Sequence, residues 1–92
     1  MNATTETVTA GQTWYIAVSA DAWGRGETMD EAKKQMKKAG GNLRTYLVYR
    51  WENLTAKPWI DESGCSVTEG PGSKDRKCVH AVKGGKVVPA PE

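Results

Sequence analysis

Apolar and polar side chains alternate along residues 13–20, which is the pattern of a strand with one buried face. The larger apolar side chains share one face: Trp14, Ile16, Val18 and Ala20. The other face carries Tyr15, Ala17 and Ser19. The pattern predicts a half-buried strand whose Ile16 and Val18 lie in the core.

A helix is predicted from about Met29 to Ala39. Thr28 and Glu31 form a T-x-x-E capping box at its start, in which the Thr28 hydroxyl accepts from the Glu31 amide and the Glu31 carboxylate reaches back to the Thr28 amide. Gly40-Gly41 is a strong signal for its end. A narrow apolar stripe runs along it, and we expect the last three of its four residues to pack on a sheet: Met29, Ala32, Met36 and Ala39.

The rest of the chain is typical of strands separated by turns. Leu43 to Trp51 is the strongest strand, and apolar groups on both of its faces favour a central position. We expect Leu47, like Ile16 and Val18, to lie in the core between the helix and the sheet. Further strands are predicted at Trp59–Asp61, Cys65–Thr68, Arg76–Val82 and Val87-Val88, with turns at Ser63-Gly64 and Lys83–Lys86. The fold class is therefore α+β: one helix packed on a mostly antiparallel sheet of about four to five strands, in β-α-β-β-β order. No second helix is predicted, so the opposite face of the sheet should stay partly exposed.

Ninety-two residues are enough for one small domain. Residues 1–12 are rich in Thr and lack large apolar side chains, so we expect a disordered tail there, a single domain over residues 13–88 and a frayed end over residues 89–92. The chain does not start with a basic segment followed by an apolar one, and no apolar run approaches the roughly 20 residues of a membrane-spanning helix. These features predict a cytoplasmic protein that does not bind a membrane.

Catalytic and metal chemistry find little support in the sequence. Cys65, Cys78 and His80 are the candidate metal ligands or nucleophile–base pair, but a fourth ligand, a C-x-x-C pair and a third group to orient the histidine are missing. We expect buried free thiols, although the spacing of the two cysteines also permits a disulfide across a hairpin. The sequence predicts no enzyme activity, no cofactor and no metal.

Gly24 and Gly26 precede the predicted helix, at a place where backbone amides attract phosphate groups. A phosphate site is disfavoured, because the third glycine of a dinucleotide motif and a P-loop lysine are missing and three acids surround the helix start: Glu27, Asp30 and Glu31. We expect the two glycines to give the backbone freedom to turn ahead of the cap.

Two kinds of binding surface remain open. The net charge is +2, and residues 31–60 hold the basic excess, with seven cations against two acids. A protein-binding surface would use the residue types that dominate interfaces, here Trp23, Arg25, Tyr46, Arg50 and Trp59. A nucleic-acid-binding surface would use the cations of the helix and of the segment after it: Lys33, Lys34, Lys37, Lys38 and Arg44. In that alternative, bases would stack on Tyr46, Trp51 and Trp59.

The first half of the chain joins a Tyr-containing strand, a W-G-x-G-x-T-x-x-E-A segment, a Lys-rich helix, a Gly-Gly pair and a second Tyr-containing strand: Trp14–Val18, Trp23–Ala32, Lys33–Lys38, Gly40-Gly41 and Tyr46–Tyr49. This arrangement, over residues 14–51, resembles small phage and mobile-element accessory proteins of the anti-defence type. The start of the helix also resembles that of antitoxins with a split dsRNA-binding-like fold, whose strands come in a different order. The resemblance assigns no functional residue.

The resemblance implies a virus- or plasmid-encoded accessory factor that acts by binding host machinery. We therefore expect a non-enzymatic protein that binds and inhibits a host protein complex, with a CRISPR-type, nucleic-acid-guided defence effector as the favoured target. The alternative is a small nucleic-acid-binding module that uses the Lys-rich helix and exposed aromatic residues.

Overall fold

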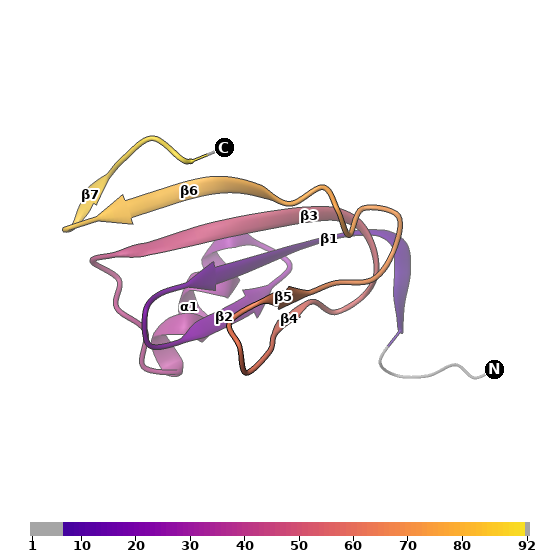
Figure 1. The fold of residues 1–92 in the computed structure, drawn as a ribbon, viewed down its shortest axis with the longest axis horizontal. Helices are drawn as coiled ribbons and strands as arrows, with labels where there is room; N and C mark the ends of the chain where they lie inside the picture. Colours follow the sequence, from indigo (N-terminus) through magenta and orange to yellow (C-terminus); the bar gives the residue numbers. More distant parts are fainter. Residues whose placement is uncertain (1–6, 92) are drawn as a thin grey trace.

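Five antiparallel strands form the main sheet, and one helix packs against it (Figure 1). The computed structural model describes residues 7–91. The main sheet and helix comprise β1 (Thr7–Val18), β2 (Trp23–Gly26), α1 (Met29–Lys38), β3 (Tyr46–Ala56), β6 (Lys77–Lys83) and β7 (Lys86–Val87), and a separate two-stranded sheet comprises β4 (Trp59–Ile60) and β5 (Ser66–Val67). The strands of the main sheet lie in the order β2-β1-β3-β6-β7. The α+β class is confirmed, whereas the expected β-α-β-β-β order is wrong, because β2 pairs with β1 ahead of the helix and β4–β5 leaves the main sheet.

Strand β1 is longer than the alternation in its sequence predicts. Its first residue, Thr7, pairs with Ala56 at the far end of β3, and the register shifts on either side of Gln12. Residues 7–12 are therefore paired strand and not tail, because backbone hydrogen bonds to a neighbouring strand do not require large apolar side chains. Residues 1–6 of the expected tail lie outside the described residues.

Both ends of α1 are held by capping contacts. The Glu31 amide donates to the Thr28 hydroxyl at 3.1 Å. The Glu31 carboxylate accepts from Gln35 Nε2 at 2.8 Å and does not close the second half of the capping box. At the other end, the Gly41 amide donates to the Met36 carbonyl oxygen at 2.8 Å. No helix within residues 7–91 is long and apolar enough to span a membrane.

The W-G-R-G sequence of β2 places its two glycines under the helix. A Cβ atom on Gly24 would lie 2.1 Å from the Met36 nitrogen, and one on Gly26 would lie 2.7 Å from the Ala32 nitrogen. The helix backbone thus rests directly on the strand. The expectation that these glycines supply turning freedom is wrong: neither is among the residues with a positive φ, and what the fold requires is the absence of a Cβ atom.

Helix α1 covers the sheet face that carries the smaller side chains of β1. Its fully buried residues join one core cluster with residues of three strands: Ala32 and Met36 with Ala17, Tyr46, Val48 and Val82. The predicted packing of Ala32 and Met36 is confirmed. Ala39 is exposed, because it is the C-cap residue at the very end of the helix.

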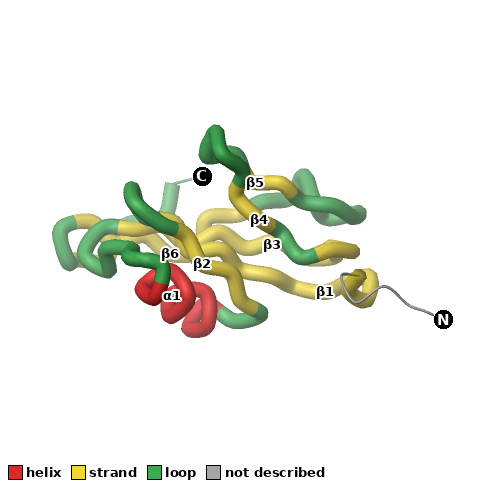
Figure 2. Tube along the Cα trace, turned by 90° about the horizontal axis from the view of Figure 1, so that it is seen from below, coloured by secondary structure: helices red, strands yellow, loops and turns green. Residues whose placement is uncertain are grey.

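The opposite face of the sheet carries the larger side chains and is covered by a hairpin. Its buried cluster consists of Trp14, Ile16, Trp51 and Leu54. The β4–β5 hairpin and α1 lie on opposite sides of the sheet (Figure 2), and Pro58, just before β4, is fully buried. Strand parity places Ile16, Val18 and Leu47 on this hairpin side, so their predicted packing against the helix is wrong. Ile16 is fully buried there, whereas Val18 and Leu47 are only half-buried.

The C-terminal hairpin follows its sequence signal. Lys83 pairs with Lys86 across a turn in which Gly84 and Gly85 have φ values of 61° and 82°. Two successive residues with positive φ are typical of the type I′ turn that suits the twist of a hairpin. Residues 89–91 follow without regular structure.

Candidate functional site

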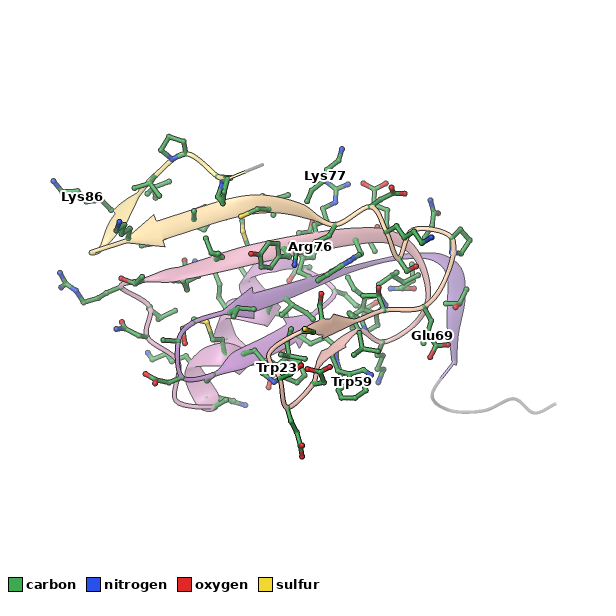
Figure 3. The ribbon with its side chains drawn as sticks, viewed as in Figure 1. Trp23, Trp59, Glu69, Arg76, Lys77 and Lys86 are labelled. Atoms are coloured by element: carbon green, nitrogen blue, oxygen red, sulfur yellow. The ribbon has the colours of Figure 1, made fainter. Side chains whose placement is uncertain are left out.

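Three of the five predicted protein-binding residues come together at the β2 edge of the sheet. The alternation of β2 directs Trp23 and Arg25 to the face that the β4–β5 hairpin covers, and Trp59 belongs to that hairpin. Arg25 Nη1 donates to the Pro58 carbonyl oxygen at 3.0 Å, which ties strand to hairpin. We call Trp23, Arg25 and Trp59 the tryptophan surface; Figure 3 labels both of its indoles.

Trp59 is an exposed indole on a fixed backbone. Its exposed fraction is 47%, whereas Trp23 and Arg25 are half-buried. The preceding Pro58 is fully buried, and the Arg25 guanidinium holds its carbonyl group. Trp59 itself pairs with Val67 in the hairpin. The indole is therefore presented to solvent by a backbone that is anchored on both sides.

The turn of the hairpin is organised by one carboxylate. Asp61 Oδ1 accepts from the Ser63 hydroxyl at 2.7 Å, from the Ser63 amide at 2.9 Å and from the Cys65 amide at 3.0 Å. These bonds, with the Ser63 hydroxyl as the largest cause, lower the pKa of Asp61 below its ordinary value. The turn thus keeps a negative charge beside the tryptophan surface at neutral pH.

An acidic groove borders the tryptophan surface. It has a volume of about 320 Å³ and separates the β1–β2 turn from the β4–β5 turn. Three carboxylate residues line it, Asp21, Asp61 and Glu62, together with Trp23 and Ile60. The region therefore combines aromatic side chains with a negative border, and its complement is an apolar pocket with a basic rim.

Tyr46 and Arg50, the other two predicted protein-binding residues, do not belong to this surface. Tyr46 is only 5% exposed, because it lies in the core cluster under α1, with Lys33 Nζ 5.9 Å from the centre of its ring. Arg50 is half-buried and forms an ion pair with Glu52. Strand parity places both residues on the helix side of the sheet, the opposite side from the hairpin.

The predicted nucleic-acid-binding residues are separated from the aromatic residues meant to complement them. Lys33 is half-buried, and the exposed cations are Lys34, Lys37, Lys38 and Arg44. Trp51 is 1% exposed and belongs to the core, so its predicted stacking role is wrong. Trp59 is exposed, but on the side of the sheet opposite the helix. The lysines and the exposed indole therefore face different directions.

Cys65 lies just before β5 and Cys78 lies in β6, and both are free. Cys65 is exposed at the end of the hairpin turn, so the expectation that both thiols are buried is wrong for this one. Cys78 is half-buried, and its Sγ donates to the His80 carbonyl oxygen at 3.6 Å, while the His80 ring lies 5.8 Å from that of Tyr46. Within residues 7–91, no three or more His, Cys, Asp or Glu side chains are grouped so as to hold a metal ion.

A basic cleft that the sequence did not predict lies between the end of β3 and the start of β6. The cleft has a volume of about 500 Å³, and its lining is Arg50, Glu52, Asn53, Lys74, Asp75, Arg76 and Lys77. The signal in the sequence is the group of three cations within residues 74–77, which follows Gly70-Pro71-Gly72 after one residue. The pattern divides these cations between a loop over residues 69–75 and the strand predicted from Arg76, and so does not indicate a common site.

Comparison with known proteins adds no relative. No protein-family model matches the chain, and neither the curated proteins nor the solved structures give a significant match. Function is therefore inferred from the surfaces described above.

Proposed function

We propose that the chain is a non-enzymatic binding protein of the host cytoplasm that engages and inhibits a host protein complex through the tryptophan surface. The observation that carries this proposal is the combination at Trp59 of an indole that is 47% exposed with a backbone anchored by Pro58 and Arg25. Tryptophan and arginine are the residue types that contribute most to interface energies.

The exposed indole offers a useful amount of binding energy. Burying the exposed half of a tryptophan removes about 100 Å² of mostly apolar surface from water, which is worth ~2.5 kcal/mol. Because the hairpin backbone is already fixed, little conformational entropy is lost when a partner covers this residue. Trp23 and Arg25 extend the same contact on β2.

The charge around the surface indicates the kind of partner. The carboxylates of Asp21, Asp61 and Glu62 favour a partner whose apolar pocket carries a basic rim. Protein machines that bind nucleic acid carry basic surfaces of this kind. A nucleic-acid-guided defence effector therefore fits the chemistry, and the resemblance of residues 14–51 to anti-defence proteins favours the same class of target.

Affinity capture from host lysate, with and without nuclease, tests the proposal. One defined protein complex should remain bound after nuclease treatment. With the purified complex, Trp59→Ala should weaken binding about 30-fold, which corresponds to ~2 kcal/mol at a central interface residue. The matched control is Leu43→Ala, which removes another exposed apolar side chain (39% exposed) outside the tryptophan surface and should change the affinity less than about twofold.

Two outcomes would contradict the proposal. One is an unchanged affinity of the folded Trp59→Ala variant for the captured complex. The other is recovery of nucleic acid alone, lost on nuclease treatment, which would favour the nucleic-acid-binding alternative.

A further inference from the structure

The loop between β5 and β6 is a built part of the fold. The Gly72 amide donates to the Asn53 carbonyl oxygen at 3.1 Å, and the Thr55 amide donates to the Glu69 carbonyl oxygen at 2.9 Å. A Cβ atom on Gly72 would lie 1.5 Å from the Glu52 carbonyl oxygen, so the loop backbone lies directly on that of β3. Asn53 adopts a φ of 59° at this contact. The wall that the loop contributes to the basic cleft is therefore fixed in place.

The basic cleft contains more positive than negative charge. Its lining includes four cations, Arg50, Lys74, Arg76 and Lys77, against two acids, Glu52 and Asp75. Glu52 is already paired with Arg50, which leaves Asp75 as the other acid of the lining. The cleft is therefore electropositive and favours an anionic ligand.

One guanidinium group of the cleft is held in place and keeps its donors free. Arg76 lies over the ring of Tyr49, with its guanidinium carbon 4.4 Å from the ring centre. Stacking of this kind fixes the plane of the guanidinium and leaves its N–H groups at the edge. The Arg50 guanidinium is paired with Glu52 and its Nε is buried, so the accessible guanidinium donors of the cleft belong to Arg76. Preorganised N–H donors of this kind suit the oxygens of a phosphate group.

The positive charge continues beyond the cleft along the β6–β7 edge of the sheet. Residues 76–91 contain four cations and no Asp or Glu. About 20 Å of strand separates Lys77 from Lys83, and Lys86 is paired with Lys83 across the hairpin. Figure 3 shows Lys77 and Lys86 along this edge and Arg76 over β3. These two groups of cations, about 20 Å apart and together called the row of cations, match a long polyanion better than they match a single carboxylate.

We propose that the basic cleft and the β6–β7 edge form a binding site for single-stranded nucleic acid, distinct from the tryptophan surface. The cleft takes one phosphate at its exposed cations, Lys74, Arg76 and Lys77, and Lys83 and Lys86 contact phosphates further along the strand. A volume of about 500 Å³ has room for one nucleotide. An oligonucleotide long enough to reach the whole row of cations should therefore bind more tightly than a mononucleotide.

Fluorescence anisotropy with a labelled oligothymidylate of about 12 nucleotides tests this site. The Arg76→Gln/Lys77→Gln variant should bind at least about 10-fold more weakly, and its dependence of log K on log salt should be shallower by about 0.7 for each phosphate that the variant no longer neutralises. The matched control is Lys37→Gln/Lys38→Gln, which removes the same charge from exposed positions on α1 and should change the affinity less than about twofold. Circular dichroism confirms folding, and Lys74→Gln/Lys83→Gln, at exposed positions, is the second variant if the first does not fold.

Three results would overturn the proposal. The first is an equal decrease of affinity in the α1 control variant, because the binding would then depend on overall charge alone. The second is equally strong competition by a polyglutamate peptide of the same charge, which would identify an acidic polypeptide as the ligand. The third is binding of thymidine monophosphate as tight as that of the oligomer, because the row of cations would then have no role. Trp59→Ala should leave oligonucleotide binding unchanged, so this test is independent of the proposed protein partner.

Discussion

Adding a single methyl group at Gly24 tests the contact on which the fold depends most. The new Cβ atom of Gly24→Ala would lie 2.1 Å from the Met36 nitrogen and 2.5 Å from the Ala32 carbonyl oxygen, where ordinary contact begins at 3.4 Å. Both obstructing atoms belong to the helix backbone, so no side-chain rotation relieves the clash. The helix must move away by more than 1 Å, which opens the packing around Met36.

The cost of this displacement is larger than ordinary overpacking. Overpacking of a core costs about 1–3 kcal/mol when side chains give way, and here the backbone itself must move, so we expect ~3 kcal/mol or more. For a domain of this size, that decrease in stability lowers the Tm by at least about 12 °C. Thermal and urea unfolding, followed by circular dichroism and by tryptophan fluorescence, measure the change.

A second glycine variant provides the control. Gly40→Ala places a methyl group where no atom lies within 4 Å, at a φ of 98°, so its cost is backbone strain alone, about 1–2 kcal/mol. If Gly24→Ala proves no more destabilising than Gly40→Ala, the close approach of α1 to β2 is wrong, and Gly24 has only the conformational role that the sequence suggested.

Three further predictions concern the core, the hairpin turn and the helix lysines. Met36→Ala should lower the free energy of unfolding by about 2–5 kcal/mol, measured by urea denaturation, because Met36 is fully buried; a decrease below ~1 kcal/mol would contradict its place in the core. Hydrogen bonds lower the pKa of Asp61 in the folded protein, so the stabilisation that its carboxylate gives the turn is present above pH 3.8 and disappears as the pH falls through the lower folded pKa. The amide resonance of Cys65, which donates to this carboxylate, should therefore titrate with a midpoint below pH 3.8. A midpoint at or above pH 3.8 would refute these hydrogen bonds. Replacing the four helix lysines by glutamine should change the affinity for the protein partner less than about twofold; these are Lys33, Lys34, Lys37 and Lys38. If this variant loses the binding while Trp59→Ala retains it, the proposed function is wrong.

Elements that depend on neighbouring residues could be predicted from the sequence. The Thr28 cap, the end of the helix at Gly40-Gly41 and the Lys83–Lys86 turn all occur where local signals placed them. Each of these depends on the conformation of a few consecutive residues, whose glycines and capping side chains carry the information. The true start of β1 could not be predicted in this way, because residues 7–12 are held by pairing with residues of β3 that lie more than 40 positions away.

The assignment of the sheet faces failed for a physical reason. Both faces of β1 are buried, so alternation alone cannot tell which one meets the helix. The larger side chains of β1 suggested that the Ile16 face packs against the helix. The helix instead packs on the opposite face, where its backbone can approach the strands most closely. The signal was the alternation of Gly24 and Gly26 in β2, since a strand with glycine at every second position offers a helix a surface without side chains.

The candidate sites differ in how far sequence could reveal them. Trp23 and Arg25 point away from the helix because they alternate with the glycines of β2, and that parity was readable. The contact of Arg25 with Pro58 joins residues 33 positions apart, so no local pattern in the sequence could predict it. The basic cleft depends on Gly72 resting on β3 beside Asn53, a non-glycine residue with a φ of 59°, which no local pattern announces.

The order of the strands decides how the two proposed surfaces relate to each other. Strand β2, with the tryptophan surface, is one edge of the main sheet, and β6–β7, with the row of cations, is the other. The acidic groove repels a nucleic acid strand from the first edge, and the cations attract it to the second. The sequence alone presented protein binding and nucleic-acid binding as alternatives. With β1 and β3 between the two edges, the proposed protein partner and the proposed nucleic acid strand would occupy separate surfaces, so one chain would have room for both at once.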